Sequence, residues 1–129
     1  MNIVRAGVVL AGVLAFPSFA HAEWTGSAVY RACIKEAGES DASMTECAHD
    51  ELDREDKRLN ASYVTVMKEA DVKLKDAIRA SQKAWISYRD LTCDVLMADG
   101  AGTLERLMHA ECEARMTAER ADWLGSIKP

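Results

Sequence analysis

The residues from Gln82 to Cys93 read QKAWISYRDLTC, with no proline or glycine to interrupt them. Gln82, Trp85 and Arg89 are separated by three and four residues, which places them on one face of an α-helix. On that face the guanidinium of Arg89 can stack on the indole of Trp85 as a cation–π pair. The stretch therefore predicts a helix with a mixed aromatic, polar and charged face, which needs partners from a neighbouring helix.

The rest of the chain also favours helices. Its 129 residues are enough for one domain, and no proline occurs between Pro17 and Pro129. Helices are expected over residues 29–37, about 43–70, about 73–97 and about 103–124. Because short connections make neighbouring helices antiparallel, we predict an all-α fold. It is a small antiparallel bundle of three main helices plus a short N-terminal helix, stapled by two disulfides.

Local signals set the expected helix ends. Gly38 ends the short helix, and Ser43 followed by Glu46 matches a capping box at the start of the next. A turn is expected near residues 70–72, because one helix of about fifty residues would be long for a compact domain. The sequence DGAG at residues 99–102 is a helix breaker. Thr103 is then the predicted N-cap of the last helix.

The apolar residues recur at helical spacing, which indicates the sides that face the core. The dense charges between Asp50 and Arg58 are interpreted as a mostly solvated face. The inward positions are predicted to be Cys47, Leu52, Leu59, Tyr63, Val66 and Ala70; then Leu74, Ile78, Trp85, Leu91 and Leu96; then Leu104, Leu107, Met108, Cys112, Met116 and Trp123.

A turn near residue 71 predicts which side chains face each other across the first long hairpin. The expected pairs are Asn60 with Gln82, Leu59 with Trp85, Tyr63 with Ile78, and Asp56 with Arg89. Since facing polar groups must pair once buried, we interpret this seam as a polar layer that fixes helix register. A polar binding pocket is the alternative. Asp90 lies about 100° around the helix from Arg89 and is expected to have other partners.

The first 22 residues have the features of a secretory signal peptide. A positive residue, Arg5, precedes an apolar stretch over residues 6–16 that is too short to span a bilayer. Pro17 breaks this stretch, and Ala20-His21-Ala22 is a small-x-small cleavage site. We therefore predict a signal peptide over residues 1–22, a single domain over 23–129, and a periplasmic or secreted location without membrane association after cleavage.

All four cysteines, Cys33, Cys47, Cys93 and Cys112, follow the predicted cleavage site. An even number of cysteines in an exported chain indicates disulfides. A turn near residue 102 folds Cys112 back beside Cys93, which leaves Cys33 to pair with Cys47. The pairing of Cys47 with Cys93, and of Cys33 with Cys112, stays open as the alternative because the first hairpin can also bring Cys47 near Cys93.

Charge and residue types exclude several function classes. The net charge of −5 becomes −6 once Arg5 is removed, and an acidic domain lacks the clustered cations that nucleic acid requires. It suits a cationic partner instead, and the alternative is that the net charge only keeps the protein soluble. His49 and His109 are the only histidines after residue 22, and neither lies near a serine nucleophile in sequence. Two Cys and two His could in principle bind zinc, but export favours disulfides. We predict no enzyme activity and no cofactor or metal.

Three groups of residues together carry a resemblance. They are Asp56-x-x-Leu59-Asn60-x-x-Tyr63, Gln82-x-x-Trp85-x-x-Tyr88-Arg89-Asp90-x-x-Cys93, and Cys112-x-x-x-Met116-Thr117-x-x-Arg120 after the Gly102-Thr103 turn. In this order and spacing they resemble the LprI-like lysozyme inhibitor family of exported bacterial proteins, over about residues 33–124. The resemblance implies a helical, disulfide-bonded domain that inhibits lysozyme. No cysteine stands where a lipid anchor would need one, so a soluble form is expected.

An inhibitor of this kind needs exposed acids and a few apolar anchors, but no catalytic group. Trp24, Tyr30 and the turn at residues 100–103 are expected to be exposed, and are candidate contacts with lysozyme or another cationic protein. An exported interaction or envelope-stress protein with a different partner is the alternative. The family-motif residues are interpreted as structural: Asp56, Leu59, Asn60, Tyr63, Gln82, Trp85, Arg89, Asp90, Thr117 and Arg120.

Overall fold

A computed structural model describes residues 24–128, so the predicted signal peptide lies outside the described residues. The elements are α1 (Ala28–Ala37), α2 (Asp41–Glu69), α3 (Val72–Asp94), the short 3-10 helix η1 (Val95–Met97) and α4 (Thr103–Ser126). Between residues 24 and 128 there is no β-strand. The predicted all-α bundle, with three long helices and one short N-terminal helix, is confirmed.

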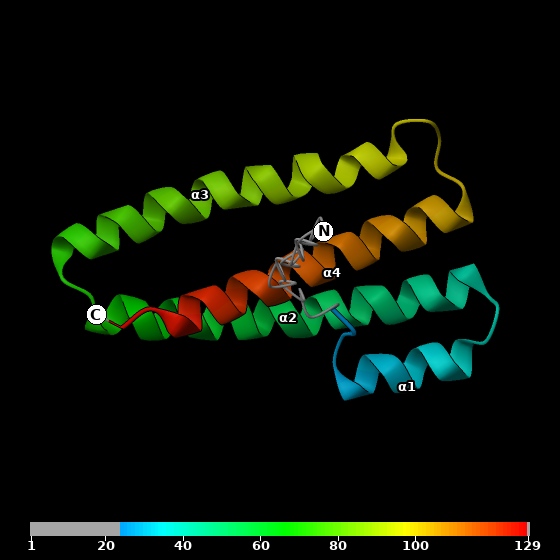
Figure 1. Cartoon of the computed structure of the whole chain (residues 1–129), viewed down its shortest axis with the longest axis horizontal. Coiled ribbons are helices and arrows are strands. Elements are labelled where there is room, and N and C mark those ends of the chain that lie inside the picture. The colour runs from blue at the N-terminus through cyan, green and yellow to red at the C-terminus, as the bar shows by residue number, and fades with distance from the viewer. Residues whose placement is uncertain (1–23, 129) are drawn as a thin grey trace, which may run out of the picture.

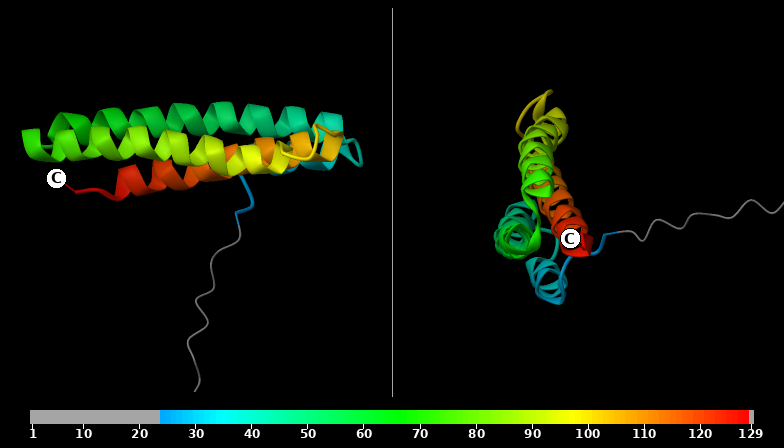
Figure 2. Two further views of the ribbon diagram at one scale, coloured as in Figure 1. Left: turned by 90° about the horizontal axis from the view of Figure 1, so that it is seen from above. Right: turned by 90° about the vertical axis from the view of Figure 1, so that its left-hand side faces the viewer.

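Consecutive helices run in opposite directions (Figure 1). As a result α2 and α4 are parallel to each other, and α3 is antiparallel to both. The most extensive helix–helix contact is between α2 and α4, which are not consecutive in the chain. The end-on view in Figure 2 places α3 on one side of this pair and α1 on the other. The core therefore centres on a pair of helices that the sequence analysis does not predict, because it pairs only helices that are consecutive in the chain.

Alanines make the close approach of α2 and α4 possible. Ala110, Ala114, Ala118 and Ala121 are all buried and recur every three or four residues along one face of α4. The separation of packed helices depends on the size of the side chains between them, so these small residues let the two backbones come near. Larger apolar side chains then fill the space at the ends of the contact: Leu59, Val66, Leu107 and Leu124.

This orientation of α4 corrects part of the predicted core. Leu104, Met108 and Trp123 were expected to face inward, but all three are exposed because the alanine face of α4 meets α2. Leu91 was expected inside on α3 and is 70% exposed. The prediction followed the largest apolar side chains, whereas the packing follows the smallest ones.

Two predicted helix starts are also wrong in detail. Helix α2 begins at Asp41, and its N-cap is Ser40, whose hydroxyl accepts a hydrogen bond of 3.3 Å from the backbone N–H of Ser43. Ser43 is therefore inside the first turn and is not the cap. Thr103 is the first residue of α4 and not its cap, and its hydroxyl donates to a carboxylate oxygen of Asp41 at 3.0 Å. That bond ties the starts of α2 and α4 together.

Both disulfides have the preferred predicted pairing. Cys33 of α1 is bonded to Cys47 of α2, and Cys93 of α3 is bonded to Cys112 of α4. The alternative pairing of Cys47 with Cys93 is thereby excluded. Each bridge fastens an outer helix to the central α2–α4 pair. Cys47 and Cys112, the two cysteines that could have joined His49 and His109 in a zinc site, are both in these bridges, so neither has a free thiolate to offer a metal.

Candidate functional site

The family-motif residues meet in the seam between α2 and α3. A cavity of about 250 Å³ lies there. Seven of the ten motif residues line it, together with Ile86: Asp56, Leu59, Asn60, Tyr63, Gln82, Trp85 and Arg89. Three of the four pairs expected to face each other across the hairpin are thus brought together at this cavity. The fourth partner, Ile78, lies in the adjoining buried core, against which Tyr63 packs.

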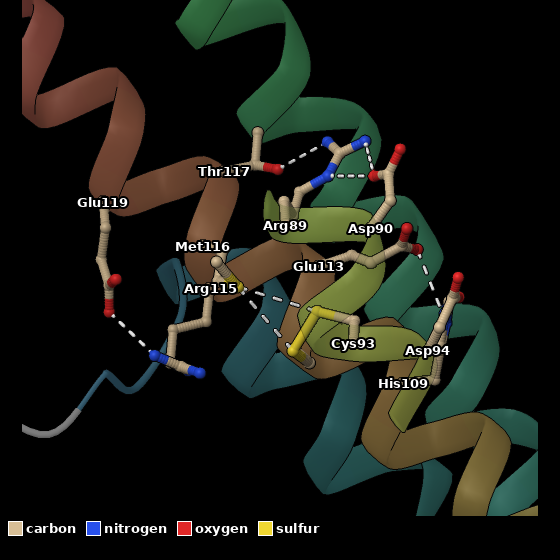
Figure 3. The surroundings of a disulfide bond; sticks show 11 residues. Arg89, Asp90, Cys93, Asp94, His109, Glu113, Arg115, Met116, Thr117 and Glu119 are labelled. Atoms are coloured by element: carbon tan, nitrogen blue, oxygen red, sulfur yellow. Dashed lines mark hydrogen bonds and ion pairs between the residues drawn. A yellow bond between two sulfur atoms is a disulfide. The ribbon is translucent and has the colours of Figure 1, made fainter. Parts of the chain in front are cut away.

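Arg89 is the centre of the seam. One terminal nitrogen donates to the hydroxyl of the buried Thr117 on α4 at 3.1 Å, as Figure 3 shows. Nε and the other terminal nitrogen donate to one carboxylate oxygen of Asp90 at 3.0 and 2.9 Å. The oxygen of Asp56 is further away, at 3.8 Å. A single side chain from α3 therefore contacts both central helices.

The separate surroundings predicted for Arg89 and Asp90 are therefore wrong. Successive Cα–Cβ bonds diverge by about 100° on a helix. The long arginine side chain nevertheless bends back far enough to reach the carboxylate of its neighbour. The expected direct hydrogen bond from Arg89 to Asp56 is instead a longer ion-pair contact, and the guanidinium nitrogen nearest to Asp56 donates to Thr117.

Two arginines lie close to the ring of Trp85. The guanidinium carbons of Arg89 and Arg120 are 5.3 and 5.6 Å from its ring centroid, and Arg120 is also 4.1 Å from the ring centroid of Trp123. Arg120 donates to the side-chain oxygens of Gln82 at 2.9 Å and of Ser81 at 2.7 Å. Burial lowers the pKa of Arg120. The aromatic and neutral polar contacts around this cation join α3 to α4.

Glu51 is an anchor that the sequence reasoning assigned to a solvated face. It is 0% exposed, and its carboxylate accepts hydrogen bonds from the backbone N–H of Ser27 at 2.5 Å and from the Ser27 hydroxyl at 2.7 Å. Arg54 donates to it at 2.8 Å. Burial works against ionisation, but the bonds from Ser27 and Arg54 outweigh it and hold the pKa of Glu51 below its usual value.

The position of Glu51 explains its role. Ser27 is the N-cap of α1, so the buried carboxylate fastens the start of α1, where the helix dipole is positive, to the middle of α2. The spacing of Glu51 in the sequence indicates its burial. Cys47, Glu51, Glu55 and Leu59 recur every four residues, and all four are buried. The acids lie on the buried stripe of α2 rather than on its outer face.

Arg58 makes the matching connection from α2 to α4. It donates to the backbone oxygen of Ala118 at 3.0 Å and to Glu55 at 2.6 Å, and it also bonds Asp122. Burial tends to lower the pKa of Arg58, but the carboxylates of Asp122 and Glu55 outweigh burial and raise it. Arg58 is thus bonded to partners on both α2 and α4.

A larger cavity of about 480 Å³ opens near the disulfide between Cys93 and Cys112, where the end of α3 lies beside α4. It is lined by Trp24, Thr25, Tyr30, Thr92, Leu96, Met108, Glu111, Cys112 and Arg115. The predicted exposure of Tyr30 is wrong: it is 6% exposed, and its hydroxyl donates to Glu111 at 2.5 Å. Burial raises the pKa of Tyr30, and the hydrogen bond to the negatively charged Glu111 raises it further. Trp24 is half-buried, and residues 100–103 are exposed as expected.

Chemically, these two sites are suited to binding and to holding the fold. Around Arg89 and Arg120 the charged and polar groups bond one another. Within residues 24–128 no three His, Cys, Asp or Glu side chains gather as metal ligands. In the same part of the chain, no helix is long and apolar enough to cross a membrane.

Comparison with known proteins decides the family. The model of the family described as lysozyme inhibitor LprI matches residues 33–124, a range that holds both disulfides and every motif residue. The chain belongs to this family. An uncharacterized protein of Rhizobium meliloti (strain 1021) is 28% identical over 102 residues, which cover 68% of this chain and 72% of that protein. No solved structure matches this LprI-family chain.

Proposed function

We propose that this protein is an exported, periplasmic or secreted inhibitor that blocks lysozyme by non-catalytic association. The observation that carries the proposal is the match of the LprI lysozyme inhibitor family over residues 33–124. An inhibitor acts by occupying its target, so it needs a rigid complementary surface and no nucleophile or acid–base pair. The family is named for inhibition and not for catalysis.

Charge and redox chemistry support this function. The chain carries a net charge of −5, and lysozymes are commonly basic, so opposite charge would speed their encounter. Two disulfides suit an oxidising compartment, and the predicted signal peptide over residues 1–22 would deliver the chain there. The motif residues would serve this function indirectly, by holding α3 in a fixed position on the α2–α4 pair.

An inhibition titration tests the proposal. The full chain would be exported in a bacterial host, purified from the periplasm with its disulfides formed, and titrated against several lysozyme types at low and high salt. We expect loss of lysozyme activity at near-stoichiometric ratio, with weaker inhibition at high salt because exposed charges are screened. No inhibition of any lysozyme type at micromolar protein would contradict the proposal. A pull-down that enriches a different periplasmic protein would then favour an interaction protein with another partner.

A further inference from the structure

The exposed apolar side chains are distributed unevenly over the bundle. Of the ten large hydrophobic residues that are exposed within residues 24–128, eight belong to α3, η1 and α4, and α1 and α2 carry one each, Val29 and Val64. Five of the eight gather near the end where α3 and η1 lead into α4. We call these five the α3–α4 face: Tyr88, Leu91, Val95, Leu104 and Met108.

Helical geometry makes this face continuous. Tyr88, Leu91 and Val95 are three and four residues apart, so they form one outer stripe on α3 and η1. Leu104 and Met108 are four apart on α4, which runs back beside α3 (Figure 1). The 480 Å³ cavity adjoins both stripes: Met108 lines it from α4, and Thr92 and Leu96, the neighbours of Leu91 and Val95 in sequence, line it from the other side.

The exposure of this face is large for a chain that is soluble on its own. Leu91 and Val95 are 70% and 69% exposed, although both are large aliphatic residues. Single exposed apolar residues are ordinary on protein surfaces, but a contiguous group beside a cavity is typical of a protein–protein contact. The cavity offers a place for a partner's apolar or aromatic side chain, the kind of anchor that dominates binding energy.

Charge indicates the kind of partner. Residues 72–87 and 116–126, which form one half of the α3–α4 hairpin, contain five basic residues and three acids, whereas residues 88–115 contain six acids and three arginines. The α3–α4 face therefore lies in the acidic half of this hairpin, and the basic half lies at the opposite end. A cationic protein would be attracted to the face and oriented by the difference between the two halves. A second copy of the same acidic surface would be repelled.

We infer that the α3–α4 face is the surface that binds lysozyme, with the cavity taking an apolar side chain of the enzyme and the acids around it meeting its cationic surface. This inference rests on the proposed function and names the surface that performs it. The exposed turn at residues 100–103 adjoins the face and extends it along the end of the bundle. On the opposite helices, Val29 and Val64 have no such neighbours among the exposed large hydrophobic residues.

The test compares matched variants of the full chain, exported and purified from the periplasm. Leu91→Ser combined with Val95→Ser removes two apolar residues from the face without changing charge, and Leu104→Ser combined with Met108→Ser does so from α4. Val29→Ser combined with Val64→Ser is the control on the opposite helices. Inhibition constants are measured by titration, thermal unfolding checks the fold, and sedimentation checks the oligomeric state.

We expect each face variant to weaken inhibition about tenfold or more, and the control to change it by less than about twofold. Full inhibition by both face variants, while the wild type also inhibits, would overturn the inferred surface and leave the proposed function standing. A wild-type chain that inhibits no lysozyme would overturn both. A wild-type dimer that the face variants convert to monomers would show that the face joins two copies, and would also overturn the inference.

Discussion

The α2–α4 contact and the attachment of α3 are built in different ways. Helices α2 and α4 meet along their length through small buried residues such as Ala114, which is 0% exposed. Helix α3 makes a much smaller backbone contact with its neighbours. It is held by long side chains, mainly Trp85 and Arg89, and by the bridge from Cys93 to Cys112.

The two kinds of attachment differ in how much apolar surface they leave exposed for a partner. Helix α2 exposes one large hydrophobic residue, Val64, whereas α4 packs on α2 through its alanine face and exposes larger apolar residues on its other sides. A helix held by a few long anchors can keep much of its surface free, and α3 exposes Tyr88 and Leu91. The family motif therefore marks the attachment of α3, while the surface we assign to lysozyme lies on the outer side of that helix and on the adjoining start of α4.

The largest effect should come from disturbing the α2–α4 contact. Ala114→Leu forces a large side chain between two closely approaching backbones, and we expect it to lower the free energy of unfolding by about 3 kcal/mol. Ala84→Leu is the matched control, because Ala84 is exposed on α3 and the same change there meets solvent. Urea unfolding of both variants measures the difference. Equal stability of the two would mean that the alanine contact does not carry the fold.

Removing the buried carboxylate should have the next largest effect. Glu51→Gln weakens the bonds from Ser27 and Arg54, and we expect a loss of about 2.5 kcal/mol at neutral pH. The pKa of Glu51 is lowered by folding, so its contribution is present above the unfolded-state pKa and is lost as pH falls through the folded-state value. The gap between wild type and variant should therefore shrink on acidification.

Glu46→Gln provides the comparison for this carboxylate, because Glu46 is exposed on the same helix. We expect it to change stability by less than about 0.5 kcal/mol at any pH. Denaturant unfolding from neutral to acidic pH measures all three proteins. A gap between wild type and Glu51→Gln that stays constant across this range would contradict the assigned ionisation of Glu51.

Disturbing the attachment of α3 should lower the free energy of unfolding by less than either of these two changes. Arg89→Ala removes the bond to Thr117 and the contact with Trp85, and we expect a loss of about 2 kcal/mol. Inhibition should persist at protein concentrations and temperatures where the variant stays folded. Unchanged stability together with loss of inhibition would instead identify the seam as the binding site, which was the alternative interpretation of this motif.

The smallest effect on stability is expected at the face itself. Leu91→Ser and Val95→Ser replace side chains that already contact solvent, so each should change the free energy of unfolding by less than about 0.5 kcal/mol. Thermal or urea unfolding measures this directly. A loss above about 2 kcal/mol would show that these residues support the bundle and are not free for a partner.

Helical spacing and the positions of the cysteines relative to the turns predicted the order of the helices, the antiparallel packing of consecutive helices and both disulfides. They also brought Asp56, Asn60 and Gln82 to one seam. They did not predict the parallel α2–α4 contact, because hairpin geometry relates only consecutive helices. Alanine carries little hydrophobic weight in a periodicity search, so the buried face of α4 was assigned to Leu104 and Met108 instead of Ala114.

Long and charged side chains caused the remaining differences. Arg89 reaches Asp90 through the flexibility of its own side chain, which spacing on a helix does not reveal. Glu51 looked solvated because it lies among other charges, and only its tertiary partner Ser27, on a segment far away in the sequence, makes its burial favourable. The candidate contact Tyr30 is buried by a similar long-range partner, Glu111.

Hydrogen–deuterium exchange with and without lysozyme tests the central claim most directly, because it reports all helices of the full chain in one experiment. We expect added protection over residues 88–96 and 103–108, and unchanged exchange around Val64 on the outer side of α2. Protection confined to α1 and α2, with residues 88–108 exchanging as in the free protein, would contradict the assignment of lysozyme binding to α3 and α4.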